Sequence, residues 1–146
     1  MELIIKRFTE LTLEELYAIL SCRQEIFVEE QKINYNDTDY LDQDSTHLFL
    51  KNKEEIVSYL RIIDPGVKYR ETSIGRVLTM PDYRREGLSR RLMELAIQEV
   101  RSRNEMPIRI EAQEYLVKFY ESLGFMPISD SFILEGIPHV SMLLPE

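Results

Sequence analysis

The feature that most constrains the fold is a change of pattern around one glycine, where an apolar strand is followed by a helical stripe. Residues 73–79 read SIGRVLT, a short apolar run typical of a buried strand. IRIEA at 108–112 has the same character. A strand, helix, strand succession implies that these two strands pair in parallel through a right-handed crossover. Between them, after Gly87, apolar residues recur at spacings of three and four, as in a helix that lies on a sheet: Leu88, Leu92, Leu95, Ala96 and Val100.

Other segments add strands and helices on both sides of this unit. Thr12 and Glu15 form a capping box that predicts a helix from Leu13 to Phe27. Leu116, Phe119, Tyr120 and Leu123 predict a shorter helix that ends at Gly124. The remaining strands are expected at 3–5, 47–50, 56–63, around 125–132 and at 139–144. The 146 residues therefore predict one mixed α/β (α+β) domain, 1–146, with about seven strands.

Four arginines surround Gly87 in a chain whose 26 acidic residues outnumber its 18 basic ones. They stand at positions 84, 85, 90 and 91, where the long helix begins. A helix N-terminus carries partial positive charge, so added cations there are unfavourable unless an anion binds. Unpaired N–H groups, a glycine and guanidinium groups together describe a phosphate site. Alternatively, the arginines are solvated or paired with acidic residues such as Glu86 and Glu94.

Composition excludes several other classes of protein. Neither a P-loop nor a dinucleotide-binding fingerprint occurs. One cysteine and two histidines leave no metal-ligand cluster of familiar spacing, so no metal is expected. The net charge of −8 and the lack of stacking aromatics other than Tyr83 near the arginines argue against nucleic-acid binding. No stretch approaches the roughly 20 apolar residues of a membrane span, so we expect a cytoplasmic protein.

Two stretches resemble the signature motifs of the GNAT N-acetyltransferase superfamily. Residues 84–89, RREGLS, resemble the loop of its motif A, with Ser89 where Gly or Ala is usual. AQEYLVKFYESLGF resembles its second motif, with Tyr120, Gly124 and Phe125 in register, although Gln113 and Leu116 stand where Asn and Ala are usual. RQEIFVEEQ, NYNDTDYLDQD and EGIPHVSM resemble the ElaA-like subgroup, so the resemblance spans nearly the whole chain.

The resemblance implies a GNAT-type fold: a twisted, mostly antiparallel sheet in which the parallel pair 73–79 and 108–112 splays, with helices on both faces. It also implies acetyl-coenzyme A (acetyl-CoA) as co-substrate and the primary amine of a small molecule or peptide as acceptor. By the same resemblance the pantetheine arm lies along Val77, Leu78 and Thr79. The pyrophosphate is expected to contact Arg84, Arg85, Glu86, Gly87, Leu88 and Ser89.

For catalysis, the resemblance makes Tyr120 the candidate acid that protonates the departing thiolate. The alternative is that Tyr120 belongs to the core. Glu111 or His139 is the candidate base that takes a proton from the amine; a histidine here could equally be a structural hydrogen-bonding group. The acidic residues Glu29, Glu30, Asp37 and Asp39 are either solvated or attract a cationic acceptor.

Two other classes of function stay open at this point. A non-catalytic sensor of coenzyme A or a nucleotide would keep the anion site but lack a productive acid. An interaction module would use the arginines on an acidic partner. The sequence leaves open whether the protein is a monomer or a homodimer.

Overall fold

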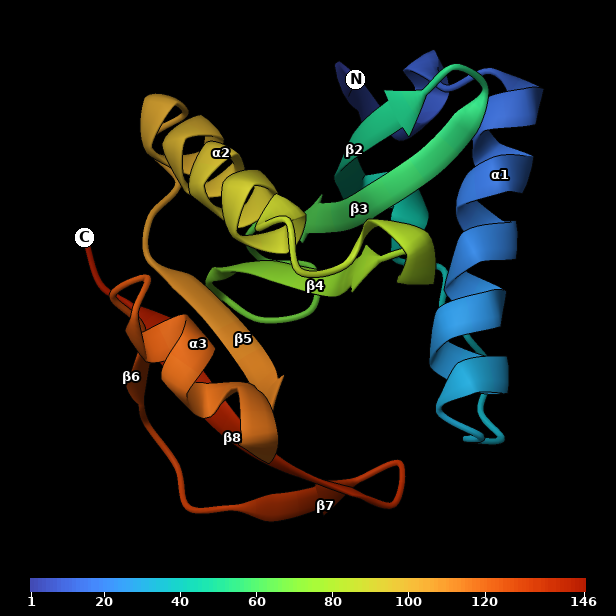
Figure 1. The fold of residues 1–146 in the computed structure, drawn as a ribbon. Helices are drawn as coiled ribbons and strands as arrows, with labels where there is room; N and C mark the ends of the chain where they lie inside the picture. Colours follow the sequence, from blue (N-terminus) through green and yellow to red (C-terminus); the bar gives the residue numbers. More distant parts are fainter.

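The computed structural model describes residues 1–146 and contains one continuous sheet of eight strands (Figure 1). The strand order is β1-β2-β3-β4-β5-β8-β6, and β7 also pairs with β8. All pairs are antiparallel except β4 and β5, which are parallel as predicted. The strands are β1 (Glu2–Arg7), β2 (Ser45–Asn52), β3 (Glu55–Ile63), β4 (Thr72–Thr79), β5 (Ile108–Gln113), β6 (Met126–Pro127), β7 (Phe132–Leu134) and β8 (Ile137–Leu144).

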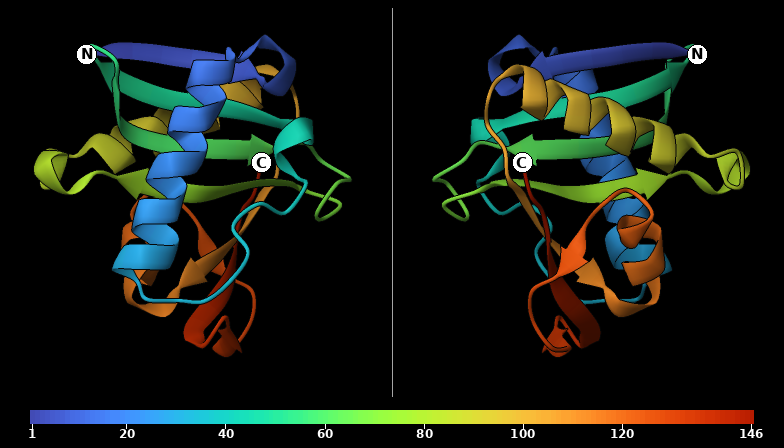
Figure 2. Two further views of the ribbon diagram at one scale, coloured as in Figure 1. Left: turned by 90° about the vertical axis from the view of Figure 1, so that its right-hand side faces the viewer. Right: turned by 90° about the vertical axis from the view of Figure 1, so that its left-hand side faces the viewer.

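Helices cover both faces of the sheet, which confirms the predicted arrangement. Helix α1 (Leu13–Arg23) lies on one face, whereas α2 (Leu88–Ser102) and α3 (Val117–Glu121) lie on the other (Figures 1 and 2). The apolar stripe of α2 joins the larger core, and α1 packs on a smaller core that includes Phe49 and Tyr59. The capping box forms as expected, because the Glu15 N–H donates to the Thr12 hydroxyl at 3.0 Å.

Two segments differ from the predicted elements. The strand expected around 125–132 is two short strands, β6 and β7, separated by the polar Ser129–Asp130–Ser131 turn. This break brings the number of strands to eight. The first helix does not end at Phe27 but continues beyond α1 as a π-helical segment, η2 (Gln24–Glu30). π-Helical turns are uncommon and often lie at functional sites.

The parallel strands β4 and β5 separate soon after they begin. They pair only at Thr72–Ile108 and Ser73–Arg109. Farther along, the register of β3 and β4 shifts, so that Arg76 and Val77 together face the single residue Leu60. Arg76 has a φ of 53°, so this bulge bends β4. The edge of β4 toward β5 is therefore without a neighbouring strand from Ile74 to Thr79.

Candidate active site

A cleft of about 650 Å³ lies where β4 and β5 diverge. Its walls come from η2, β3, β4, the start of α2, β5, α3 and the β7–β8 hairpin. Of the twelve residues predicted to contact the cofactor or to take part in catalysis, eleven line this one cleft; only Glu86 does not, and its side chain is exposed. The structure therefore brings together residues that are up to 62 positions apart, from Val77 to His139.

The start of α2 presents unpaired backbone donors to this cleft. Gly87 precedes the helix with a φ of +74°, in the left-handed region that favours glycine. The Arg91 N–H is the first to bond a carbonyl, that of Gly87 at 3.0 Å. The N–H groups of Gly87, Leu88, Ser89 and Arg90 have no partner within the protein. No atom lies within 4 Å of the position where a Cβ of residue 87 would stand, so a ligand can approach these donors closely.

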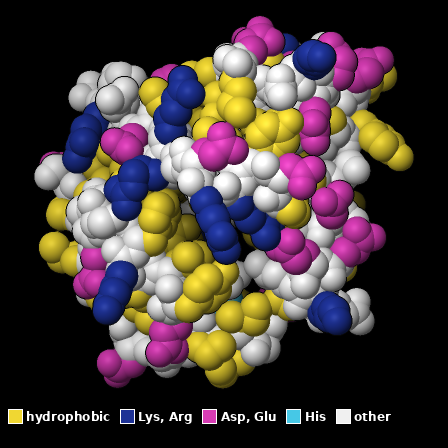
Figure 3. Space-filling view, viewed as in Figure 1, with side chains coloured by type: hydrophobic (Ala, Val, Ile, Leu, Met, Phe, Trp, Pro, Cys, Tyr) yellow, Lys and Arg dark blue, Asp and Glu magenta, His cyan; other side chains and the backbone are white.

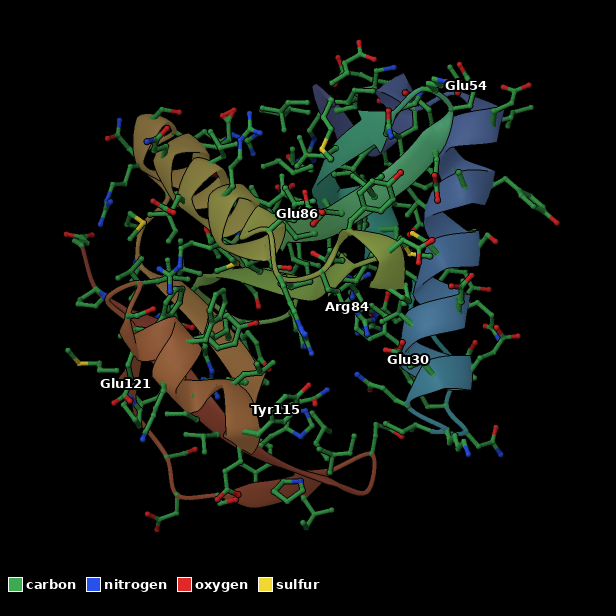
Figure 4. The ribbon with its side chains drawn as sticks, in the orientation of Figure 1. Glu30, Glu54, Arg84, Glu86, Tyr115 and Glu121 are labelled. Atoms are coloured by element: carbon green, nitrogen blue, oxygen red, sulfur yellow. The ribbon has the colours of Figure 1, made fainter.

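The arginines around this turn have two kinds of surroundings. The Arg84 guanidinium donates to the Thr79 carbonyl at 3.0 Å and to Glu30 on η2 at 2.8 Å, so its acidic partner is neither Glu86 nor Glu94 (Figure 4). Arg85 is exposed and lines the cleft without a partner. Basic side chains lie beside a hollow near the centre of this face (Figure 3).

Arg90 spans from α2 to α3 at the opposite wall. It donates to the Ser122 hydroxyl at 2.6 Å, and its guanidinium lies 5.2 Å from the centre of the Phe119 ring. A guanidinium over an aromatic face gains cation–π attraction. Arg90 thereby helps to hold α3 beside the first turn of α2.

A chain of three hydroxyl groups fixes β4 to the start of α2. The Ser58 hydroxyl donates to the Leu78 carbonyl at 2.9 Å and lies 3.0 Å from the Thr79 hydroxyl, which lies 2.7 Å from that of Ser89. Each hydroxyl has one hydrogen, so Thr79 donates to Ser58 and Ser89 donates to Thr79. Ser89 therefore has no hydroxyl hydrogen left for a ligand, and only its backbone N–H is available to an anion.

Two of the residues expected to contact a cofactor direct their side chains into the core. Leu78 is 3% exposed and Leu88 is 8% exposed. Leu78 packs in the smaller core and Leu88 in the larger one. Their backbone, rather than their side chains, is what they can offer to a ligand in the cleft.

Tyr120 is both a core residue and a wall of the cleft. Its ring packs edge-on against Phe119 and Phe125, at centroid distances of 5.1 and 5.9 Å. Its hydroxyl makes no hydrogen bond within the protein, although it is one of the residues that line the cleft. Burial raises the pKa of Tyr120 to about 12, with a smaller contribution from Tyr115. The phenol is therefore protonated at neutral pH.

His139 and Glu111 lie on the adjacent strands β8 and β5. The Nδ1 atom of His139 is 2.7 Å from the Ile137 carbonyl, which can only accept, so Nδ1 carries the hydrogen of the neutral ring. This tautomer leaves Nε2 as an acceptor. The Glu111 carboxylate accepts from the Tyr69 hydroxyl at 2.6 Å and from the Ser141 hydroxyl at 2.5 Å.

The acidic loop does not offer free carboxylates to a cationic acceptor. It contributes Asp37, Asp39 and Asp42 to a set of ion pairs with three arginines, and neither Asp37 nor Asp42 is more than 6% exposed. Burial would raise the pKa of Asp39, but hydrogen bonds and charge from Arg61 hold that pKa well below its usual range. We call this set the charge cluster: Arg23, Arg61, Arg76, Asp37, Asp39 and Asp42.

Three basic residues of the cleft were not predicted from the sequence: Arg61, Lys68 and Arg76. Arg61 stands inside the apolar run of β3 and is 1% exposed. An arginine within an otherwise apolar strand was the signal that could have found this group, because a buried charge requires a partner nearby. The four aspartates of the loop at 34–44, three of which pair with these arginines, were the matching half of that signal.

Comparison with known proteins assigns the chain to a family. A family model described as an acetyltransferase (GNAT) domain matches residues 18–145. The chain belongs to the GNAT acetyltransferase family. A UPF0039 protein of Synechocystis is 38% identical, over 94% of this chain and 91% of the relative.

Solved structures of GNAT relatives have the same fold. An acyl-CoA N-acyltransferase from Pseudomonas aeruginosa is 36% identical, with a TM-score of 0.92 and coverage of 98% of this chain and 99% of that one. Escherichia coli ElaA is 31% identical, with a TM-score of 0.90 and 97% of each chain covered. The resemblance to the ElaA-like subgroup is thereby confirmed.

Two further observations concern metal-binding groups and membrane-spanning helices in this GNAT chain. No His, Cys, Asp and Glu side chains gather in a group of three or more that could bind a metal ion. None of its helices has the length and apolar character needed to cross a bilayer.

Proposed function

We propose that the protein is an N-acetyltransferase that moves an acetyl group directly from acetyl-CoA to a primary amine. The observation that carries this proposal is the row of unpaired N–H groups from Gly87 to Arg90, at the mouth of a cleft in a GNAT chain. Backbone donors at a helix start bind phosphate well, because the helix dipole and the N–H groups act together.

The shape of the cleft supports coenzyme A as the ligand. The pyrophosphate would be held by the N–H groups at residues 87–90 and by Arg85, whose side chain has no partner in the protein. The open edge of β4 at Val77–Thr79 would accept the amide groups of the pantetheine arm, as a neighbouring strand would. Acetyl-CoA would supply an activated thioester, and the protein's own groups would hold it and move the protons.

The reaction requires one bond to form and one to break. The neutral amine nitrogen attacks the thioester carbonyl, a backbone N–H of Val77–Thr79 stabilises the oxyanion, and the carbon–sulfur bond breaks. The nitrogen loses a proton and the sulfur gains one. We assign the proton on sulfur to Tyr120. Nε2 of His139 or, through water, Glu111 is assigned the proton that an arriving ammonium group loses before it attacks.

The pKa of Tyr120 sets a condition on this scheme. Transfer from a phenol with a pKa of about 12 to a thiolate with an ordinary pKa near 8.5 is uphill by about 3.5 pKa units, or roughly 5 kcal/mol. Tyr120 must therefore regain a proton as it gives one up. The nitrogen of the tetrahedral intermediate is positively charged and acidic, so it can provide that proton.

The test measures binding and turnover on the same protein. Acetyl-CoA should raise the melting temperature with increasing concentration, because a ligand that binds only the folded state stabilises it. With a panel of amines, free thiol should then be released at a rate that depends on the amine. An unchanged melting temperature at millimolar acetyl-CoA contradicts the proposal. Stabilisation without thiol release from any amine would instead indicate a coenzyme A sensor.

A further inference from the structure

Basic residues outnumber acidic ones along the cleft, although the chain as a whole is acidic. The whole chain has a formal charge of −8. Six basic residues line the cleft, against three acidic ones, Glu30, Glu111 and Glu135. Three of the basic residues, Arg84, Arg85 and Arg90, belong to the proposed pyrophosphate site. The other three need a different explanation: Arg61, Lys68 and Arg76.

These three residues face the cleft from the side of the sheet that α1 covers. Arg61 alternates along β3 with Leu60 and Ile62 of the larger core and lies on the face of Tyr59, which packs beneath α1. The proposed pyrophosphate site begins at α2, on the other face. A ligand bound at α2 therefore leaves this second group of basic residues for another molecule.

Residue 75, which lies between Arg61 and the cleft, has no side chain, although Arg61 itself is only 1% exposed. Gly75 on β4 pairs directly with Arg61 on β3, and paired residues project to the same face of a sheet. No atom lies within 4 Å of where a Cβ of residue 75 would stand. A larger side chain here would cover Arg61. The Arg61 Nε–H is itself buried and has no hydrogen-bond partner.

The acidic partners of Arg61 and Arg76 lie outside the lining of the cleft. Asp37, Asp39 and Asp42 hold Arg61 and Arg76 in place, yet none of these aspartates lines the cleft. Lys68 lies in the loop before β4 and makes no ion pair. Withdrawal from solvent lowers the pKa of its ammonium group, and the nearby charges of Arg61 and Arg76 lower it further, although much of the side chain is exposed. Lys68, whose Nζ lies 5.3 Å from the centre of the Tyr69 ring, is therefore the cation of this group without an acidic partner.

We propose that this end of the cleft binds an anionic group of the acceptor, so that the acceptor is a primary amine carrying a carboxylate or phosphate a few bonds from its nitrogen. Lys68 and Arg76 contact the anion, and Arg61 supports them with its charge. This inference rests on the proposed acetyl transfer, because it names the acceptor for that reaction.

The same positive charges favour the reactive form of the amine. An ammonium group next to like charges is destabilised, so its pKa falls and the neutral nucleophile becomes more abundant. Glu111 and His139 line the same cleft and can take the released proton. Attraction between the anionic group of the acceptor and these cations thus offsets the repulsion between the cations and the ammonium form of the amine.

Three matched acceptors test the proposal. Serine carries a carboxylate, O-phosphoethanolamine a phosphate, and ethanolamine neither, while all three share the same aminoethyl unit. Phenylalanine and 2-phenylethylamine form a second pair. Turnover is measured as thiol release with acetyl-CoA, and binding is measured by calorimetry on the protein saturated with coenzyme A.

The expected result is that at least one anionic acceptor exceeds its neutral partner by tenfold or more in kcat/KM and in binding. The two anionic arms then show whether carboxylate or phosphate is preferred. Lys68→Gln should reduce the preference for the anionic acceptor about tenfold, because the loss of one hydrogen bond to a charged group weakens binding by about this factor. Lys118→Gln removes an exposed lysine of α3 that lies outside the cleft and should retain the preference.

Two results overturn the inference. If each neutral amine has the same kcat/KM as its anionic partner, the proposed acetyl transfer still holds but the anion site is wrong. Failure of every anionic probe to bind also overturns it, whether or not acetyl-CoA binds. If anions bind in a Lys68-dependent way but acetyl-CoA neither binds nor releases thiol, the anion site stands and the proposed function is wrong.

Discussion

Gly87→Glu is the substitution that most directly separates the fold from the proposed cofactor site. Residue 87 has a φ of +74° and open space around its Cβ position, so a Cβ there meets no atom beyond its chain neighbours. A residue other than glycine in this left-handed conformation costs about 1–2 kcal/mol. At roughly 2–4 °C per kcal/mol for a chain of about this length, the melting temperature of the free protein should fall by about 2–8 °C.

The effect on acetyl-CoA binding should be much larger. For the wild-type protein, ligand at 100 times its Kd adds about 2.7 kcal/mol of stability. The same conversion makes this a rise of roughly 5–11 °C. In the variant a carboxylate stands among the N–H groups of residues 87–90, where the pyrophosphate would bind. Like charge and lost space should abolish the rise, as measured by thermal melts at increasing acetyl-CoA.

Gly66→Glu is the matched control. Gly66 has a φ of +84°, also has no atom within 4 Å of its Cβ position, and does not line the cleft. The control therefore introduces the same backbone strain and the same charge at a distant turn. It should lower the melting temperature of the free protein similarly but keep the full acetyl-CoA effect. A full ligand-induced rise in Gly87→Glu refutes the assignment of this turn to the pyrophosphate.

Three further predictions follow from single groups. Tyr120→Phe should keep the acetyl-CoA-induced rise in melting temperature, because the hydroxyl makes no hydrogen bond within the protein. Its kcat should fall about 10²–10⁴-fold, because the proton donor is lost. Retained turnover would make Tyr120 a core residue only. Ser89→Ala should lower stability by about 1 kcal/mol through its bond to Thr79, yet leave acetyl-CoA binding unchanged in a titration, because its hydroxyl hydrogen already points to Thr79. In urea melts, the free energy of unfolding should fall as the pH drops from about 5 toward 2. The reason is that the pKa of Asp39 and that of Asp42 are lower in the folded protein than their usual values near 3.9. A free energy of unfolding that does not change over this pH range contradicts the prediction.

The parts of the fold that could be predicted were those set by local pattern. The stripe from Leu88 to Val100 fixes one face of α2, and its position between two apolar runs implies the parallel β4–β5 pair. Gly87 could be placed at the start of α2 because the strand pattern ends before it and the helical one begins after it. These inferences needed only residues within about 40 positions of one another in the chain.

The parts that could not be predicted depend on charged side-chain pairs that form only when a loop packs against a helix or strand. Arg23 and Asp37 are 14 positions apart and Arg76 and Asp37 are 39 apart, and no periodicity marks such pairs. The bulge at Arg76 is likewise not revealed by a run of apolar residues, and the splay of β4 from β5 was expected only from the family resemblance. The acidic loop was expected to be solvated or to attract a cationic acceptor, whereas its aspartates pair with arginines of the protein itself.

The pair between Arg84 and Glu30 explains how cations can stand at a helix N-terminus before any ligand binds. A cation near this end of a helix is unfavourable by about 0.3–1 kcal/mol, and a neighbouring carboxylate offsets that cost. Both side chains are about 40% exposed, at 42% and 41%, so the pair itself contributes at most about 1 kcal/mol. An anion that brings two or more negative charges to the N–H groups of α2 can therefore displace Glu30 at little cost. Glu30→Gln should then strengthen acetyl-CoA binding, because the competing carboxylate is gone. Weaker binding in that variant, with the fold intact, would mean that Glu30 positions Arg84 for the ligand instead of competing with it.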